Sequence, residues 1–388
     1  MLADSKTAAF VATQSAPAAN IPATESDASA RRKTVVPLPW PLGAVQELVQ
    51  RLKPVDRLVR LHFLQFSWML ILLGAASGLQ PGHALGLGQL AGLLAIASSF
   101  HVFAYVLNDV VDLPVDRTQP SRRHDPLVSG AVKPGHALTL ALAQVPIGVG
   151  LVALVDLMIG GTAAIEATVA LLAGFVFMAI YDVWGKKCPV PPVTDLAQGL
   201  GWASLVACGA YLVGTPSSTT WVAFLYGAGF ILLINGVHGG LRDLENDLAN
   251  GCRTSAIFFG GRPGHEVTWG LRLFAGSVQA GLIALTLIAL VRNDFGYSST
   301  VLKLTSSLVI ALNLVCAWNL LAVFQPERPS WGLAFRVHLF LLLVTWIVLF
   351  LPSLAPLTAA ALVLGFLGPL LFFDATHQVL ERLFSKPS

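Results

Sequence analysis

Two acidic clusters carry the residue types and spacing in this sequence that suit catalysis. The first is the segment 108–116, NDVVDLPVD, in which Asn108, Asp112 and Asp116 recur every four residues. Residues four apart lie on one face of an α-helix, so these side chains project together if the helix continues through Pro114. The segment therefore predicts a row of oxygen ligands along one helix face.

The second cluster is the segment 243–247, DLEND, in which Asp243 and Asp247 are again four residues apart. Ionised carboxylates at the end of a membrane helix are costly and usually have a function or a partner. Oxygen ligands suit Mg²⁺, which is typically held by one or two carboxylates together with waters and substrate phosphates. The two clusters together predict a magnesium site that takes a phosphorylated substrate.

Basic residues follow both clusters and are expected to hold phosphate oxygens, as charged donors do. They are Arg122, Arg123, Lys186, Lys187 and Arg253. For any single aspartate the alternative is a solvated loop acid in an ordinary surface ion pair. Because both clusters lie close to basic residues and are expected on the same side of the membrane, the binding site is favoured over that alternative.

The elements that position these residues are predicted to be membrane-spanning helices. The chain is 55% hydrophobic and only 12% charged, against about 25% charged residues in soluble domains. Apolar runs of about 20 residues recur, the length that crosses a bilayer. Nine spans are expected near 61–80, 88–110, 137–158, 162–182, 194–213, 220–240, 267–291, 302–324 and 332–352, and the run 356–374 is a tenth span or a surface helix. The predicted fold is an all-α bundle of nine or ten transmembrane helices.

Positive charge predicts the orientation of this bundle, because cytoplasmic loops collect Lys and Arg. The loops after the second, fourth and sixth spans are basic, whereas those near 81–87, 159–161 and 214–219 contain no Lys or Arg. The N-terminus and both acidic clusters are therefore expected on the cytoplasmic side. Asp156 and Glu166 are expected at the opposite interface.

Outside the spans, the segment 1–40 is rich in Ala, Ser, Thr and Pro and is expected to be a disordered cytoplasmic tail. The segment 41–60 is expected to lie along the membrane surface, 61–374 to form the transmembrane domain, and 375–388 to form a C-terminal tail. The four cysteines show no paired spacing, which argues against a disulfide framework or a zinc site.

The two acidic segments resemble the paired motifs of the UbiA superfamily of intramembrane prenyltransferases. Residues 108–116 match the family's NDxxDxxxD, and 243–256 are similar to DxxxDxxxGxKSTA. Residues 126–130, PLVSG, resemble RPLxSG, with Asp125 standing where the family has arginine. Tyr181, Lys186, Lys187 and Gln198 resemble its YxxxK…Q segment.

The resemblance implies an isoprenyl diphosphate donor, an acceptor that is lipophilic or aromatic, and a central cavity that opens laterally to membrane lipid. It implies that Mg²⁺ binds to Asp109, Asp112, Asp116, Asp243 and Asp247. It implies that the diphosphate contacts Asn108, Arg122, Arg123, Lys186, Lys187 and Arg253, and that Tyr181 joins the aspartates in catalysis. No nucleic acid and no obligate protein partner is expected.

Aromatic faces are expected to stabilise the allylic cation that forms when the diphosphate leaves. Candidates are Phe103, Tyr105, Tyr181, Trp184 and Trp202. Ordinary helix packing is the alternative for each of them. His238 and His101, one and two turns inside the acidic clusters, are interpreted as hydrogen-bonded packing residues, with acceptor binding or proton transfer as the alternative.

Two other functions remain open at this point. A membrane terpene cyclase of the same superfamily would use the same magnesium and diphosphate site, but the substrate's own double bonds would capture the cation. A transporter would place its acidic residues near the middle of the membrane. The clusters lie at helix ends beside basic residues, which favours the enzyme.

Overall fold

The computed structural model describes residues 55–79, 83–161 and 164–369, and throughout these ranges the regular structure is helical. Eight helices in the described chain are long and apolar enough to cross a membrane. They are built on α3 (Leu87–Asp116), α4 (Pro134–Ile159), α5 (Ala164–Trp184), α6 (Pro191–Val213), α7 (Ser218–Leu233), α11 (Trp269–Val291), α12 (Ser299–Val323) and α13 (Trp331–Phe350). Each lies at one of the predicted spans, so the chain is an integral multi-pass membrane protein.

The two outermost predicted spans form shorter helices. The first is α2 (Leu64–Gly78), which follows the short 3₁₀ helix η1 (Leu61–Phe63), and the last is α14 (Pro356–Pro369). A 15-residue helix such as α2 extends about 22 Å at 1.5 Å per residue, less than the ~30 Å hydrocarbon core. The segments 1–40, 41–54 and 375–388 lie outside the described residues.

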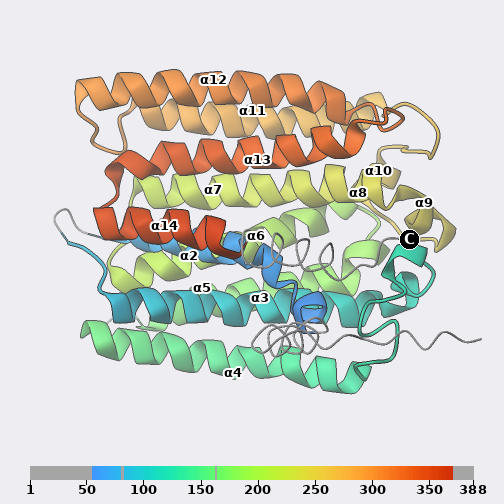
Figure 1. Ribbon diagram of the computed structural model, residues 1–388, viewed down its shortest axis with the longest axis horizontal. Helices are drawn as coiled ribbons and strands as arrows, with labels where there is room; N and C mark the ends of the chain where they lie inside the picture. Colours follow the sequence, from blue (N-terminus) through green and yellow to red (C-terminus); the bar gives the residue numbers. More distant parts are fainter. Residues whose placement is uncertain (1–54, 80–82, 162–163, 370–388) are drawn as a thin grey trace, which may run out of the picture. The chain divides into compact units, whose positions relative to one another are not determined.

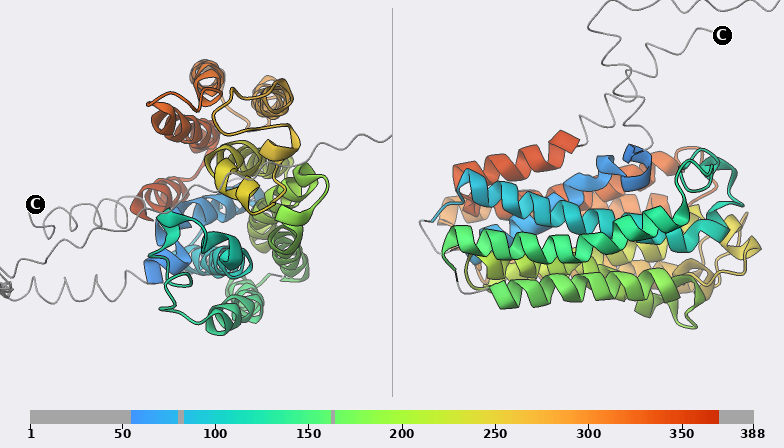
Figure 2. Two further views of the ribbon diagram at one scale, coloured as in Figure 1. Left: turned by 90° about the vertical axis from the view of Figure 1, so that its right-hand side faces the viewer. Right: turned by 90° about the horizontal axis from the view of Figure 1, so that it is seen from below.

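The helices lie side by side along a common direction (Figure 1), and the end-on view shows them in cross-section (Figure 2). Helix α6 packs against α2, α5 and α7, while α3 packs against α4, α11 against α7, and α14 against α2. Within an 18-residue apolar window of each helix, 72% of the α6 window and 61% of the α3 window are buried. Only 22% of the α4 window and 28% of the α12 window are buried. Helices α3 and α6 therefore form the interior, and α4 and α12 face lipid.

Small residues let α2 and α6 approach closely. A Cβ atom added at Gly74 would lie 2.0 Å from the carbonyl oxygen of Val206, and one at Gly209 would lie 2.3 Å from the carbonyl oxygen of Ile71. Backbones this close exclude any side chain, which is the usual reason for glycine between membrane helices. This contact fixes α2, and with it the segment that precedes α2, against the core.

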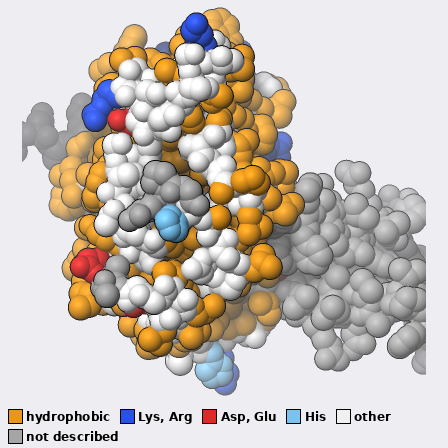
Figure 3. Space-filling model, turned by 90° about the vertical axis from the view of Figure 1, so that its left-hand side faces the viewer, with side chains coloured by type: hydrophobic (Ala, Val, Ile, Leu, Met, Phe, Trp, Pro, Cys, Tyr) orange, Lys and Arg blue, Asp and Glu red, His pale blue; other side chains and the backbone are white. Residues whose placement is uncertain are grey.

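Both acidic clusters lie at the same end of the bundle, which we call the acidic end. Helices α3 and α5 finish there, and the short helices α8 (Gly240–Arg242), α9 (Leu244–Ala249) and α10 (Ser255–Phe258) lie at the right-hand side of Figure 1. Figure 3 views the opposite end, which is mainly hydrophobic and uncharged, with a few scattered basic and acidic side chains. The predicted asymmetry of charge between the two ends is thus visible in the fold.

Candidate active site

Helix α3 carries the first cluster in the predicted register. The helix runs through Pro114 to Asp116, so Asn108, Asp112 and Asp116 share one face. The Asn108 amide Nδ2 lies 3.5 Å from Asp112 Oδ2. Asp116 is 5% exposed and Asp109 is 8% exposed. The carboxylates of this cluster are therefore largely removed from bulk water.

The second cluster follows an irregularity that the sequence did not predict. Helix α7 continues into a π-helical turn, η4 (Ile234–Gly239), and then into α8. Asp243 lies at the bend between α8 and α9, and the Asp247 N–H still donates to the Asp243 carbonyl at 2.9 Å. Single π turns inside α-helices are frequent at functional sites. The turn shifts the register of the residues that follow, which places Asp243 and Asp247 at the acidic end.

The two carboxyls of this cluster are in different electrostatic environments. Burial raises the pKa of Asp243, but the Arg242 guanidinium more than offsets burial and the pKa lies below its ordinary value. Arg242 Nε lies 3.0 Å from Asp243 Oδ1, and Arg242 Nη2 lies 2.6 Å from Asp243 Oδ2. Burial raises the pKa of Asp247 above its ordinary value, with Lys186 acting in the opposite direction. Asp247 is 3% exposed.

Lys186 joins the two clusters. It lies in the short 3₁₀ helix η3 (Gly185–Lys187) that follows α5. Its ammonium Nζ is 2.9 Å from Asp112 Oδ2 and 3.7 Å from Asp247 Oδ1. The Lys186 carbonyl accepts a hydrogen bond from the backbone N–H of Arg253 at 2.8 Å. Lys186 thus lies between Asp112 of the first cluster and Asp247 of the second.

Two arginines lie on the other side of the first cluster. Arg122 Nη1 is 3.0 Å from Asp116 Oδ2 and 3.7 Å from Asp109 Oδ1. Arg60 forms an ion pair with Asp109, and its guanidinium lies 5.1 Å from the centre of the Tyr105 ring. Arg60 was not predicted as a site residue, because no local motif in the sequence marks it.

The backbone that delivers Arg60 is held in an unusual conformation. Arg60 has φ 54° and ψ 52°, the left-handed region that non-glycine residues seldom adopt. The His101 Nε2 lies 2.9 Å from the Val59 carbonyl and 3.2 Å from the Arg60 carbonyl, and its Nδ1 lies 2.8 Å from Ser67 Oγ. His101 is thus a hydrogen-bonded packing residue, and both of its ring nitrogens have partners.

Polar contacts also join the segments that flank the clusters. Thr118 Oγ1 donates to Asn246 Oδ1 at 3.0 Å and accepts from Asn250 Nδ2 at 2.9 Å. Ser255 Oγ donates a short hydrogen bond to Asp195 Oδ2, which connects α10 to α6. These contacts hold the segment after α3 against α9.

A layer of two polar residues lies inside the charged groups. The Asn108 amide donates to Asp182 Oδ1 at 3.2 Å. Asp182, near the end of α5, is 6% exposed. The neighbouring Tyr181 ring packs against Gly185, where an added Cβ would lie 3.4 Å from the ring.

Aromatic rings form the next layer. The Trp202 ring centre lies 5.7 Å from that of Tyr105, 5.4 Å from Phe66 and 5.3 Å from Phe100. Phe103 packs on Phe175 nearby, with ring centres 4.7 Å apart. Trp184 is 57% exposed and points away from this group.

His238 belongs to a buried polar chain in the C-terminal helices. Its Nδ1 lies 2.9 Å from the Leu233 carbonyl, and its Nε2 lies 2.9 Å from His338 Nδ1 on α13. His338 Nε2 faces Gln279 Oε1 of α11 at 3.3 Å, and Gln279 Nε2 faces Cys316 Sγ of α12 at 3.8 Å. This chain attaches three helices to η4 and agrees with the interpretation of His238 as a packing residue.

Three of the predicted diphosphate ligands have exposed side chains instead of contacts with the carboxylates. Arg123 Nε donates to the ring Nε2 of its neighbour His124 at 3.0 Å. Lys187 is exposed beside Lys186, and Arg253 is exposed although its backbone contacts Lys186. These three lie around the carboxylates rather than among them.

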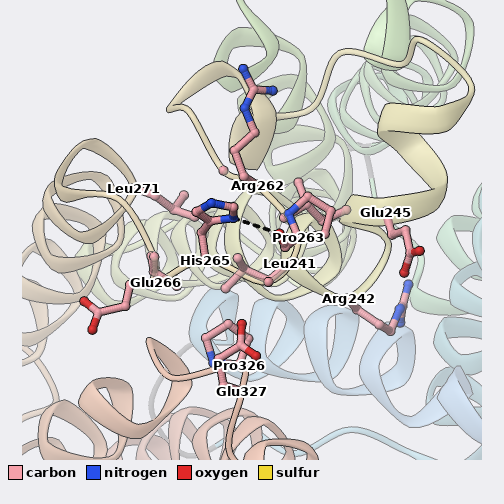
Figure 4. A pocket seen from close by; sticks show the side chains of 14 residues that line it. Leu241, Arg242, Glu245, Arg262, Pro263, His265, Glu266, Leu271, Pro326 and Glu327 are labelled. Carbon is pink, nitrogen blue, oxygen red and sulfur yellow. Dashed lines mark hydrogen bonds between the residues drawn. The ribbon is translucent and has the colours of Figure 1, made fainter.

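A pocket of about 250 Å³ lies at the acidic end beside Arg242. It is formed by the loops that precede α11 and α13 (Figure 4), and His265 Nδ1 lies 2.9 Å from the Pro263 carbonyl at its rim. Glu245, Glu266, Arg262 and Glu327 also line it. Leu244 and Glu245 of the second cluster line the pocket, together with Arg242, which pairs with Asp243.

The donor set suits a metal ion that takes further ligands from its substrate. In residues 55–79, 83–161 and 164–369, no three His, Cys, Asp or Glu side chains converge closely enough to hold an ion by themselves. Basic side chains lie between the carboxylates instead, and the buried Asp247 Oδ1 has no hydrogen-bond partner among the described residues. Mg²⁺ fits this set, because it keeps waters and binds through few carboxylates plus phosphate.

Comparison with known proteins agrees with this arrangement. The model of the UbiA prenyltransferase family matches residues 63–335. A protoheme IX farnesyltransferase of Synechococcus sp. (strain JA-3-3Ab) is 27% identical over 195 residues, which cover 45% of this chain and 55% of that protein. A 4-hydroxybenzoate octaprenyltransferase of Pseudoalteromonas translucida (strain TAC 125) is 25% identical over 193 residues, which cover 50% of this chain and 60% of that protein.

The chain thus spans between 55% and 60% of the length of these two curated relatives. The fold is similar to that of a UbiA homolog from Archaeoglobus fulgidus bound to GPP and Mg²⁺, with a TM-score of 0.53 and 17% identity over 79% of this chain and 99% of that chain. The family match extends from α2 to α13 and includes both acidic clusters, so this chain belongs to the UbiA prenyltransferase family.

Proposed function

We propose that this protein is a Mg²⁺-dependent intramembrane prenyltransferase that moves an isoprenyl group from its diphosphate to an acceptor. One observation carries the proposal: Lys186 contacts Asp112 of the first cluster and Asp247 of the second, at 2.9 and 3.7 Å. The Lys186 ammonium would bind phosphate oxygens, and the two carboxylates beside it would bind the metal ions of the diphosphate. A transporter would need its acidic groups near the middle of the membrane.

The carboxylates would hold the metal, and the basic residues would hold the phosphate oxygens. Metal ligation is assigned to Asp109, Asp112, Asp116, Asp243 and Asp247. When bound, Mg²⁺ supplies Lewis-acid neutralisation of the charge that grows on the departing diphosphate. Diphosphate binding is assigned to Asn108, Arg122, Lys186 and Arg60, while the exposed Arg123, Lys187 and Arg253 attract the anion from outside.

The layered arrangement explains how ionisation would be contained. Lys186 and Arg122 would draw the leaving diphosphate toward the acidic end, because they lie there among the carboxylates. The allylic cation would remain deeper, beside Tyr181, Tyr105 and Trp202. Aromatic faces attract cations by about 0.5–2 kcal/mol each, and the apolar surroundings exclude the water that would otherwise capture the cation.

The acceptor is proposed to be aromatic. A relative named 4-hydroxybenzoate octaprenyltransferase supports this assignment, and the structure of a homolog bound to GPP and Mg²⁺ supports the donor class and the metal. The acidic end is proposed to face the cytoplasm, because Lys and Arg collect in cytoplasmic loops.

The test is product analysis with purified protein in liposomes. Geranyl, farnesyl and geranylgeranyl diphosphate are supplied with Mg²⁺ or with EDTA, and with or without 4-hydroxybenzoate. Prenylated acceptor and free diphosphate are expected only with Mg²⁺. A cyclic hydrocarbon formed without acceptor would replace this proposal with a terpene cyclase. No release of diphosphate from any donor would refute both.

A further inference from the structure

Asp182 is a buried carboxyl to which the functions above assign nothing. Its Oδ1 accepts the Asn108 amide at 3.2 Å, and its Oδ2 has no hydrogen-bond partner among the described residues. The side chain carries no ion pair with any described basic residue, in contrast to Asp109, Asp112 and Asp116. Leaving a buried polar atom unpaired costs about 1–3 kcal/mol, so this oxygen is placed for a group that arrives with the substrates.

The depth of Asp182 indicates which group that is. Asp182 on α5 precedes Lys186 of η3 by four residues, and Asn108 precedes Asp112 by four residues on α3. Both helices run toward the acidic end, and four helical residues rise about 6 Å. The Asn108–Asp182 pair therefore lies about one turn deeper than the Lys186–Asp112 contact. Tyr105, a further three residues back on α3, begins the aromatic layer.

Resting on the proposed prenyl transfer, we infer that Asp182 is the base that removes the proton lost by the acceptor. The bond between the allylic carbon and the diphosphate oxygen breaks, and its electron pair leaves with the diphosphate. A π-electron pair of the acceptor ring forms the new C–C bond. The proton on that ring carbon then passes to Oδ2 of the ionised Asp182 carboxylate, which becomes a neutral carboxyl, and the C–H electrons restore the aromatic ring.

The neighbouring titratable groups are less suited to this role. Asp109, Asp112, Asp116 and Asp243 are each paired with a basic side chain, which weakens a carboxylate as a proton acceptor. Both ring nitrogens of His101 have partners. Asp247 lies 3.7 Å from the Lys186 ammonium, and Asp195 accepts a hydrogen bond from Ser255. The departing diphosphate is a further competitor, and the experiment separates it from Asp182.

The experiment compares Asp182→Asn with Asp182→Glu and a matched control. Asparagine keeps an oxygen for the Asn108 amide but cannot take a proton, whereas glutamate retains the carboxyl. Asp156→Asn is the control, because Asp156 also has a buried oxygen without a partner among the described residues, but lies near the opposite end of α4. The assay contains Mg²⁺, ring-deuterated 4-hydroxybenzoate and a prenyl donor. The donor is farnesyl diphosphate, or another prenyl diphosphate if the wild type prefers it.

Asp182→Asn is expected to keep the wild-type KM for the donor and to lose prenylated product by about 100-fold, the usual lower value for removing a general base. A primary deuterium isotope effect on product formation, absent from the wild type, is expected in this variant because proton loss becomes limiting. Asp182→Glu is expected to retain part of the wild-type rate. The control Asp156→Asn is expected to retain the full wild-type rate.

Wild-type product formation by Asp182→Asn would overturn the inference and assign the proton to the diphosphate. A raised donor KM without an isotope effect would overturn it in favour of a structural role. If Asp182→Asn does not fold, Asp182→Glu takes its place. A folded Asp182→Glu protein with a raised donor KM and without an isotope effect would also overturn the inference in favour of a structural role. Failure of the wild type to release diphosphate refutes the proposed function instead, and the inference with it.

Discussion

Replacement of Lys186 by methionine tests the central contact of the proposed site. Methionine has similar length but no charge, so Asp112 and Asp247 lose the cation between them. At an effective dielectric constant of about 20, one charge pair at 4 Å is worth about 4 kcal/mol before desolvation is subtracted. The Lys186 side chain is 29% exposed, so part of this attraction is screened by water.

Truncating one partner of a buried, hydrogen-bonded charge pair costs about 2–5 kcal/mol. With partial screening we expect about 2–4 kcal/mol here, and at 1.36 kcal/mol per tenfold this is a fall in kcat/KM of about 30- to 1000-fold. The Mg²⁺ concentration for half-maximal rate is expected to fall, because two carboxylates are no longer neutralised by the ammonium group.

The assay is Mg²⁺-dependent release of diphosphate from a prenyl diphosphate in liposomes. Lys187→Met is the matched control, since Lys187 is adjacent in sequence but exposed. Its loss is expected to cost at most about 1 kcal/mol, as for a surface charge. If Lys187→Met were as damaging as Lys186→Met, or if Lys186→Met kept normal kcat/KM, the assignment of Lys186 as the bridge would be wrong.

Three further predictions concern the metal ligands, the topology and the packing of the C-terminal helices. Asp112→Ala and Asp247→Ala should each abolish turnover while the protein still inserts and elutes normally on gel filtration, because they ligate from different clusters; near-normal Mg²⁺-dependent activity in either would reject the metal assignment. Cysteines introduced at Ser121 and Asn250 should be labelled by an impermeant reagent from the same side of sealed vesicles, and labelling from opposite sides would contradict a shared site. His338→Leu should destabilise the detergent-solubilised protein by about 1–3 kcal/mol, because it leaves a buried histidine nitrogen unpaired; an unchanged thermal unfolding temperature would contradict this.

The register of the active-site helices shows what spacing can predict. Asn108, Asp112 and Asp116 were expected on one face because four residues nearly complete a helical turn, and α3 keeps that register through Pro114. The second cluster kept its i, i+4 backbone contact, but through a bend and after a π-helical turn. No sequence pattern indicated that turn, because it depends on how η4 is held against α10 and the C-terminal helices.

The sequence by itself determined the membrane-spanning helices, the two acidic clusters and the basic residues at one end. These follow from the number of apolar residues needed to cross a bilayer and from the fixed period of the α-helix, which are local properties. Only the tertiary structure decided which cations reach the carboxylates. Adjacent residues differ by about 120° around a 3₁₀ helix axis, so Lys186 faces the site and Lys187 faces outward. Arg60 and Asp182 joined the site through contacts between helices distant in sequence, and such contacts have no local signal.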